Sequence, residues 1–317
     1  MFNRSTFGAL AIALSGAASG AWAATECVQS KWGPDDTIGS ANLLSPENTL
    51  KAAALIKQGK SQPLGIVIDA KTPAFAPRSL SLQVVQPGQA GGQRLDQFGY
   101  PGNYNDDVLQ TWIGIGSQID GLGHLGEGGL YYNCLDEKEI SQVTGLTKLG
   151  VHDIPPLVGR GVVLDMAKHM GKDVLAAGDH FGEAEIKAAA DAQGVSIGKG
   201  DIVLFHTGRT DGMLESDPTA WVSGEPGINV SGSRYMASLD VMAVGADTWG
   251  IEPVPPAPGD GAFYGHVVLL QENGIYILET MNTGPLVRDG VTEFMFVLGQ
   301  ARIRGSVQMI INPVALY

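Results

Sequence analysis

The sequence predicts a strand-rich α/β fold with few helices. Nine short runs rich in Val, Ile and Leu are typical of buried strands, and they outnumber the helical patterns. The 44 glycines and 17 prolines among 317 residues indicate many turns and short elements. The predicted strands are 64–69, 81–85, 161–165, 201–206, 241–246, 266–270, 274–278, 294–298 and 307–311.

Two segments have the apolar spacing and the end signals of helices. The first, 46–58, follows Ser45, a residue type that caps helix N-termini, and stops before Gly59. The second, 182–193, ends at Gly194. Helices are therefore expected to lie against a dominant sheet.

The first 23 residues have the three parts of a secretory signal peptide. Arg4 supplies the positive start, residues 7–14 the short apolar core, and Ala21-Trp22-Ala23 the small-x-small cleavage site. The apolar run is too short to span a membrane. The sequence therefore predicts a periplasmic or secreted protein, with residues 24–317 as a single domain.

The charge of the chain excludes some classes of partner. The net charge is −13 at pH 7, and removal of residues 1–23 takes away one Arg and no acid, which leaves −14. An acidic chain without a Lys/Arg cluster is not expected to bind nucleic acid or anionic membranes. A small molecule is the expected partner.

Two cysteines, Cys27 and Cys134, both fall in the predicted exported part. Cysteines in an oxidising compartment often pair, and a disulfide here would tie the N-terminal arm beside the glycine-rich segment. Two free thiols are the alternative, because the sequence does not show how far apart the two cysteines lie.

Residues 114–129 concentrate polar side chains among glycines. Gln118 and Asp120 are two residues apart, so both would point to one face of a strand, and His124 could fold back onto that face. Close approach of the backbone to a ligand or metal would explain the glycines. A glycine-rich surface loop with incidental polar residues is the alternative.

The same segment contains a Gly-x-Gly-x-x-Gly spacing at 121–126. This pattern indicates dinucleotide binding only between a buried strand and a helix, and polar residues precede it here. A nicotinamide oxidoreductase is therefore disfavoured. A serine hydrolase is also disfavoured, because the sequence has no Gly-x-Ser-x-Gly elbow.

Two further ligand-type residues frame the predicted strands 266–270 and 274–278. If Asn273-Gly274 forms a hairpin turn, His266 at the start and Glu279 at the end become neighbours. A buried Glu needs a partner, and a metal or an Arg is the usual one. The alternative is that Glu279 caps a turn and His266 is exposed.

Two polar residues end other predicted strands. His206 ends the strand 201–206, at an edge where substrate contacts are common. Asp247 follows the strand 241–246 and is expected to hold the turn at Trp249-Gly250.

These motifs together resemble the cyclase family, which includes bacterial kynurenine formamidase and isatin hydrolase, metal-dependent hydrolases of amide-type bonds. The family signature is His-x-Gly-Thr-His-x-Asp-x-Pro-x-His. Laid on 114–124, it keeps Gly116, Asp120 and His124, with Gly114 and Gln118 at the first two His positions, Ser117 for Thr and Leu122 for Pro. The segments that carry the resemblance are 31–44, 114–124, 160–165, 200–208 and 266–279.

The resemblance implies the family's swivelling β/β/α fold, a homo-oligomer, and a metal site. The family's later metal-binding His and Glu match His266 and Glu279, so the expected ligands of one divalent ion, Mn²⁺ or Zn²⁺, are Asp120, His266 and Glu279, with Gln118 as a further candidate. The two missing imidazoles leave too few ligands for two metals.

The activity that the resemblance implies is metal-dependent hydrolysis of a C–N bond in a small cyclic amide or an N-acyl (N-formyl) aromatic amine. Asp120 and His124 are the expected catalytic residues, with His124 as the acid/base group. The expected substrate contacts are Trp112, Tyr131, Tyr132 and His206, although the aromatic residues could equally belong to the core. A lactone hydrolase and a non-catalytic small-molecule binder are the alternatives.

Overall fold

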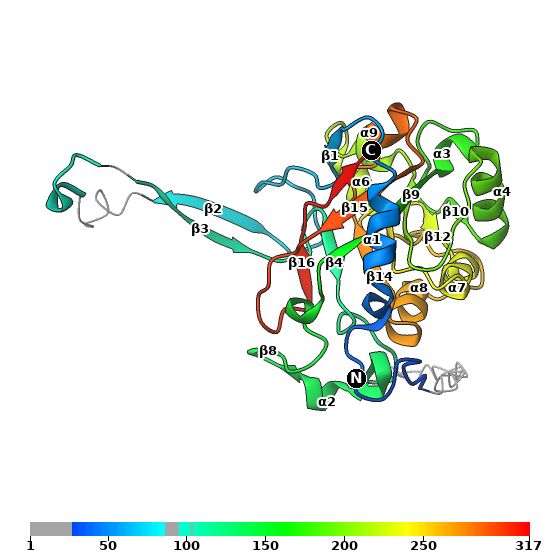
Figure 1. Cartoon of the computed structure of the whole chain (residues 1–317), viewed down its shortest axis with the longest axis horizontal. Coiled ribbons are helices and arrows are strands. Elements are labelled where there is room, and N and C mark those ends of the chain that lie inside the picture. Colours follow the sequence, from blue (N-terminus) through cyan, green and yellow to red (C-terminus); the bar gives the residue numbers. More distant parts are fainter. Residues whose placement is uncertain (1–26, 86–94, 103) are drawn as a thin grey trace, which may run out of the picture.

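The fold is built around one mixed sheet of nine strands (Figure 1). The computed structural model describes residues 27–85, 95–102 and 104–317, so the predicted signal peptide lies outside the described residues. The order across the sheet is β1 (Ser61–Pro63), β17 (Val314–Leu316), β15 (Glu293–Leu298), β9 (Leu157–Asp165), β11 (Ile202–His206), β13 (Ala243–Ala246), β14 (Tyr276–Glu279), β4 (Gln118–Asp120) and β16 (Gln308–Ile310).

The centre of the sheet is parallel and buried on both faces. Strands β9, β11, β13 and β14 run parallel, and every residue of β11 and β13 is buried. Continuous apolar runs such as Ile202–His206 suit this position, because helices and loops cover both faces of a parallel sheet. The predicted α/β class and most of the predicted strands are confirmed.

Strand β4 brings the glycine-rich segment into the sheet. It pairs antiparallel with β14 on one side and with β16 on the other, so that Gln118 lies opposite Glu279 and Asp120 opposite Gln308. The three-residue strand thereby places four polar side chains on neighbouring strands.

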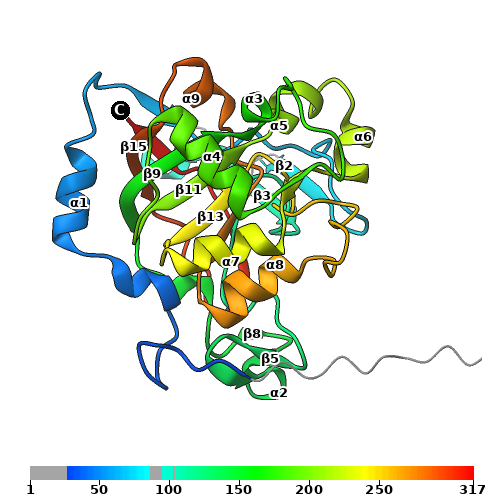
Figure 2. The same cartoon turned by 90° about the vertical axis from the view of Figure 1, so that its right-hand side faces the viewer.

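Helices cover the sheet (Figure 2), where α4, α7 and α8 lie in front of it and α1 lies at the side of β9 and β15. The helices are α1 (Pro46–Ala53), α2 (Glu137–Ile140), α3 (Met166–His169), α4 (Glu183–Gln193), α5 (Arg209–Met213), α6 (Pro218–Ser223), α7 (Val230–Ser238), α8 (Tyr264–His266) and α9 (Gly284–Arg288). A π-helix, Val267–Glu272, continues α8, and short 3₁₀ turns are Gly39–Leu43, Leu95–Phe98, Tyr132–Cys134 and Val151–Asp153.

Both predicted helices form, with one difference in length. Ser45 caps α1 by accepting a hydrogen bond from the Asn48 amide at 3.1 Å, but the helix ends at Ala53 instead of residue 58. Helix α4 ends as predicted at Gly194, which adopts the left-handed conformation at φ 67°.

The predicted strand 266–270 is wrong, and with it the hairpin. This segment is helical, and Val267 to Leu270 are all buried. A short apolar run that is buried on all sides has no period that separates a helix from a strand. The neighbours of β14 in the sheet are β13 and β4, so the hairpin partner is replaced by strands that are distant in the sequence.

The predicted strand 64–69 is also wrong. Leu64 is buried, but Val67 is 96% exposed. The amide of Ile66 donates to the Ser117 hydroxyl at 2.9 Å, so a side chain takes the place of a strand partner. The segment therefore crosses the end of the sheet as an extended loop.

Four small two-stranded sheets lie outside the main sheet. They pair β2 (Leu80–Val85) with β3 (Asp106–Thr111), β5 (Leu130–Tyr131) with β6 (Leu135–Asp136), β7 (Ser141–Gln142) with β8 (Gly145–Leu146), and β10 (His180–Phe181) with β12 (Gly227–Ile228). The β2–β3 ribbon projects from the body of the molecule (Figure 1). Within the described residues, no helix has the length and apolar character needed to cross a membrane.

Cys27 and Cys134 form a disulfide, with Cα atoms 5.6 Å apart. Next to it, the Tyr132 hydroxyl donates to the Asp36 carboxylate at 2.6 Å, and the Asn133 amide nitrogen donates to backbone oxygens of Gly33, Pro34 and Asp36. The N-terminal segment is thus fastened to the turn that follows the glycine-rich segment.

Candidate metal centre

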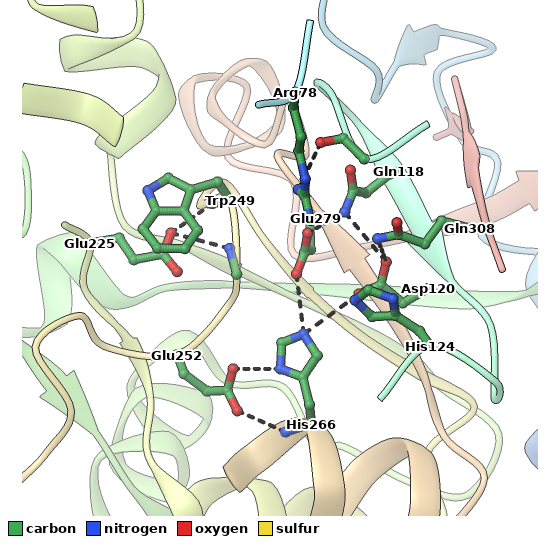
Figure 3. Close-up of polar contacts among 12 residues, drawn as sticks. Arg78, Gln118, Asp120, His124, Glu225, Trp249, Glu252, His266, Glu279 and Gln308 are labelled. Atoms are coloured by element: carbon green, nitrogen blue, oxygen red, sulfur yellow. Dashed lines mark hydrogen bonds and ion pairs between the residues drawn. The ribbon is translucent and has the colours of Figure 1, made fainter. Parts of the chain in front are cut away.

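Five polar side chains meet where β4, β14 and α8 come together (Figure 3). Gln118 and Asp120 come from β4, His124 from the following turn, His266 from the end of α8, and Glu279 from the end of β14. The two residues of β4 point to one face as predicted, because alternate residues of a strand share a side. His266 and Glu279 are neighbours as predicted, although a helix and not a hairpin brings them together.

The two oxygens of Asp120 have different surroundings. Oδ1 accepts hydrogen bonds from the Gln308 amide at 2.7 Å and the Gln118 amide at 3.4 Å. Oδ2 is fully buried and has no hydrogen-bond partner among the described residues. It lies 3.5 Å from Nε2 of His266 and 3.8 Å from Nε2 of His124. One oxygen is therefore held in place, and the other faces two imidazole nitrogens.

Glu279 repeats this arrangement. Its Oε2 accepts a hydrogen bond from Nε2 of Gln118 at 2.5 Å, and its Oε1 lies 3.3 Å from Nε2 of His266. Gln118 therefore turns its amide nitrogen toward both carboxylates. In this orientation the amide nitrogen of Gln118 holds one oxygen of each carboxylate, a supporting contact beside the ligand role expected from the sequence.

Glu252 fixes the orientation of His266, and the sequence did not identify it. Its Oε2 accepts a hydrogen bond from Nδ1 of His266 at 2.6 Å, and its Oε1 accepts one from the His266 amide at 2.7 Å. With Nδ1 as the donor, Nε2 is the nitrogen left to face Asp120 and Glu279. A carboxylate behind the imidazole is the usual support of a metal-ligating His.

The cluster carries more negative than positive charge. Asp120, Glu252, Glu279 and Glu225 are all buried carboxyls. Burial raises the pKa of Glu279, and the nearby negative charge of Asp120 raises it further, to about 8. Burial would also raise the pKa of Asp120, but His124, His266 and the bond from Gln308 bring it down to about 2. Buried carboxyls this close together are accommodated either by protonation, as the raised pKa of Glu279 indicates, or by a bound cation.

The two histidines respond to this environment in opposite directions. Burial alone would lower the pKa of His266, but Glu252, Asp120 and Glu279 raise it well above the ordinary value. Burial lowers the pKa of His124, and the charges of His266 and Arg78 act in the same direction. The side chain of His124 is 23% exposed, whereas that of His266 is 4% exposed. His124 is thus the member of the cluster that solvent reaches.

The donor set fits a divalent cation. One ligand atom each from Asp120, His124 and His266 lies within 4.8 Å of the other two. The unpaired Oδ2 of Asp120 and the Oε1 of Glu279 both face the same imidazole nitrogen, and the amides of Gln118 and Gln308 leave these oxygens free. The three residues whose ligand atoms come together are one carboxylate and two imidazoles, a set that Mn²⁺ and Zn²⁺ both accept, and Glu279 adjoins this group at Nε2 of His266.

Two glycines of the segment, Gly121 and Gly126, are required by the packing of the backbone. A Cβ at Gly121 would lie 2.8 Å from the Val307 carbonyl oxygen, and one at Gly126 would lie 2.0 Å from the Leu130 carbonyl oxygen. Glycine is needed at these two positions because neighbouring backbone leaves no space for a side chain.

The expected role of Asp247 at the turn Trp249-Gly250 is wrong. The carboxylate of Asp247 accepts hydrogen bonds from the amide and hydroxyl of Thr207, both at 2.7 Å. The turn at Trp249-Gly250 is held by Glu225, whose Oε2 accepts from the two amides at 2.7 and 3.2 Å. The expected role of Asp247 thus belongs to Glu225, an acid that no sequence motif marks.

The expected substrate contacts lie in different places. Trp112 is 52% exposed at the root of the β2–β3 ribbon, and Tyr131 packs partly buried against the core. Tyr132 is a core residue that is 1% exposed, which corrects the expectation that it lines a substrate site. Nδ1 of His206 lies 2.8 Å from the Thr283 hydroxyl and 3.4 Å from Oδ2 of Asp247, in a separate polar network.

Comparisons with known proteins place the fold. A crystal structure described as a novel cyclase is 29% identical, with a TM-score of 0.80 over 90% of this chain and 98% of that chain. Isatin hydrolase A from Labrenzia aggregata is 17% identical (TM-score 0.57, 86% and 98% covered), and a potential metal-dependent hydrolase with cyclase activity is 15% identical (TM-score 0.51, 81% and 98% covered). These last two likenesses show a common fold.

No curated protein matches the chain. The model of the family described as "Putative cyclase" matches residues 62–253, which is more than half of the 317 residues. The predicted resemblance is confirmed: the chain belongs to the cyclase family.

Proposed function

We propose that this chain is a metal-dependent hydrolase that cleaves an amide-type C–N bond in a small cyclic amide or an N-acyl aromatic amine. The observation that carries the proposal is that the two oxygens of Asp120, and likewise those of Glu279, have different surroundings. In each carboxylate, one oxygen is held by an amide and the other faces Nε2 of His266. The isatin hydrolases and the potential metal-dependent hydrolase of the same fold support the reaction class.

The residues that would hold the metal are Asp120, His266 and Glu279. A bound divalent ion lowers the pKa of a coordinated water and polarises a carbonyl oxygen. The protein contributes fixed geometry: Glu252 sets the ring of His266, and Gln118 holds Glu279. Because these supports are buried, water does not compete for them.

His124 is the proton carrier in this proposal. It is the exposed member of the cluster, and its lowered pKa favours a neutral imidazole that can accept a proton. As the C–O bond forms, His124 takes the proton of the attacking water. As the C–N bond breaks, it delivers that proton to the leaving nitrogen. Since Nε2 of His124 also lies within reach of Asp120 and His266, its role as a fourth ligand is the competing assignment.

Aromatic side chains near the cluster support a flat substrate. The rings of Phe75 and Trp249 meet edge to face, with centroids 4.3 Å apart, and both border a narrow cavity beside Gln118. Phe263 links the ring of Trp249 to that of His266, at 6.2 and 5.9 Å. Phe75 is 42% exposed, so its ring offers an aromatic surface beside this cavity against which a flat substrate can stack.

Elemental analysis combined with turnover tests the proposal. The purified protein should contain close to one equivalent of Mn or Zn, and it should hydrolyse isatin or an N-formyl aromatic amine. A chelator should abolish turnover, and Mn²⁺ or Zn²⁺ should restore it. A lactone in the same panel tests the alternative bond type. Protein that lacks metal and turns over none of the three would contradict the proposal.

A non-catalytic binding protein is the second candidate. Gly114 and Gln118 stand where the family signature has histidines, which favours a site that has lost its chemistry. This candidate predicts stoichiometric ligand binding that persists after chelation, without turnover. The two functions therefore respond differently to the same chelator.

We also propose that the protein is exported and acts as a homo-oligomer. The Cys27–Cys134 disulfide supports an oxidising compartment. The β2–β3 ribbon supports association, because one of its faces exposes Leu82 (58%), Leu109 (56%) and Val84 (64%). N-terminal sequencing should find Ala24 first, and light scattering should find a mass above that of one chain.

A further inference from the structure

Gly114 and Arg78 share one space beside the metal centre. A Cβ on Gly114 would lie 2.8 Å from Nη1 and 3.0 Å from Cζ of Arg78. Nη1 also donates a hydrogen bond to the carbonyl oxygen of Gly114 at 2.9 Å. The guanidinium of Arg78 thus fills the volume that a side chain at position 114 would need.

In the family signature, the residue at the position of Gly114 is the first histidine, whose side chain would occupy this volume. The second histidine of the signature falls on Gln118, which turns its amide nitrogen toward Asp120 and Glu279. A guanidinium has donors and no acceptor, so it binds no metal. With Gly114 and Gln118 at the two histidine positions and Arg78 beside them, the residues present offer no ligand set for a second ion.

Arg78 supplies positive charge in place of a second metal ion. Its side chain borders the same cavity as Gln118, whose amide bonds to both Asp120 and Glu279. Figure 3 shows the side chain directed toward the carboxylates from the side of Gln118. Arg is always protonated in proteins, so this positive charge does not depend on metal supply.

The surroundings of Arg78 point to a ligand. The guanidinium borders a narrow cavity of about 20 Å³, which Phe75, Trp221, Trp249 and Gln118 also line. Within the part of the chain that the structure describes, the hydrogen bond to Gly114 is the one that its five donors make. Arg78 is partly buried, and the hydrogen bonds of a guanidinium to a negatively charged acceptor are stronger than those to a neutral one.

We propose that Arg78 takes the place of a second metal ion: its guanidinium excludes a cation from the side of Gly114 and Gln118 and binds a negatively charged oxygen of the ligand. The inference rests on the proposed function for the position of the first metal. It adds that the ligand presents a negatively charged oxygen to Arg78, at the small cavity that Phe75 and Trp249 border.

Metal counting tests the exclusion. Four proteins are titrated with Zn²⁺ after chelation: wild type, Arg78→Met, the pair Gly114→His with Gln118→His, and all three changes together. Wild type, the single variant and the pair should bind one equivalent, and the triple variant should bind two. A triple variant that still binds one, or a pair that binds two with Arg78 present, overturns the exclusion.

Anion binding is the second measurement, and it needs no change at Gly114. Benzoate, a flat carboxylate, is titrated calorimetrically into wild type, Arg78→Met and Arg234→Met. The control Arg234 pairs with Glu272 on the surface at 3.1 Å. Arg78→Met should weaken benzoate binding roughly 10- to 100-fold, the range of a charge-assisted hydrogen bond, and the control should not change it. Equal binding by wild type and Arg78→Met overturns the anion site.

The two proposals fail in distinguishable ways. If wild type binds no metal, the proposed function fails, and the benzoate titration still decides the role of Arg78. If wild type binds one metal but benzoate affinity is independent of Arg78, the proposed function stands and the inference about Arg78 fails.

Discussion

Glu252 holds His266 at two points, through its amide at 2.7 Å and through Nδ1 at 2.6 Å. The two bonds fix both the backbone and the ring of His266, so that Nε2 faces Oδ2 of Asp120 at 3.5 Å and Oε1 of Glu279 at 3.3 Å. Glu252 thereby sets which nitrogen of His266 faces the two carboxylates.

Replacement of Glu252 by Gln should weaken metal binding. Gln has one oxygen, so it can accept from the His266 amide or from Nδ1 but not from both with the same geometry. Loss of such a supporting residue typically costs 10- to 100-fold in metal affinity, and we expect a decrease in about this range for Mn²⁺ by calorimetry. Glu183→Gln is the matched control, because Glu183 pairs with Lys187 on the surface of α4. Equal Mn²⁺ affinity in Glu252→Gln and wild type would contradict the supporting role.

His124→Ala and Asp120→Ala should separate catalysis from metal binding. Asp120→Ala removes a buried anionic oxygen, so it should lose most of the bound metal. His124→Ala should retain the metal while kcat falls about 10²- to 10⁴-fold, the usual contribution of general acid–base catalysis. Metal stoichiometry and turnover are measured side by side. If His124→Ala loses its metal as completely as Asp120→Ala, His124 is a ligand and the acid/base assignment is wrong.

Removal of the disulfide should destabilise the protein. Cys27 and Cys134 are 107 residues apart, so the bond closes a long loop of the unfolded chain. We expect Cys27→Ser with Cys134→Ser to lower the free energy of unfolding by about 2–5 kcal/mol, measured by urea denaturation. Thiol titration of denatured, unreduced wild type should find no free thiol. Two free thiols there would mean that the pair does not form in solution.

Glu225 should tolerate Gln but not Ala. Burial, together with the charge of Glu279, raises the pKa of Glu225 well above its ordinary value, so a neutral side chain already suits this position. Glu225→Gln keeps an oxygen for the amides of Trp249 and Gly250, and it should change the unfolding free energy by about 1 kcal/mol or less. Glu225→Ala leaves both amides without an acceptor and should cost about 2–5 kcal/mol. Thermal denaturation of the two variants should rank them in this order; equal losses would refute the assignment.

Tyr132→Phe should destabilise the protein in a pH-dependent way. Burial by itself would raise the pKa of Asp36, but hydrogen bonds from Tyr132, Ser30 and Asn42 lower it below the ordinary value of 3.8. A lowered pKa means that these bonds stabilise the fold above the pKa of the unfolded state, and that the effect is lost as the pH falls through the folded-state value. The stability difference between wild type and Tyr132→Phe should be about 1 kcal/mol at pH 7 and shrink below about pH 4. A difference that is constant with pH would contradict the role of the Asp36 charge.

Local patterns predicted what local forces determine. The caps of α1 and α4 were predicted because Ser45 and Gly194 act on backbone groups within a few residues. Gln118 and Asp120 share a face because side chains of any strand alternate. The family resemblance marked Asp120 and His124 through the signature, and His266 and Glu279 through the later His and Glu. These four side chains do meet in the structure.

The tertiary structure decided the rest. The segment after His266 became a helix because its apolar residues are buried on all sides, a condition in which the sequence has no distinguishing period. Gln308 reaches Asp120 across 188 residues, and Arg78 occupies the space beside Gly114 across 36. Such contacts depend on which strands pair in the sheet and on which side chain occupies the space beside a glycine. The sequence by itself therefore identified the four central side chains. The packing of distant segments decided which residues hydrogen-bond to them, and it placed the guanidinium of Arg78 beside Gly114.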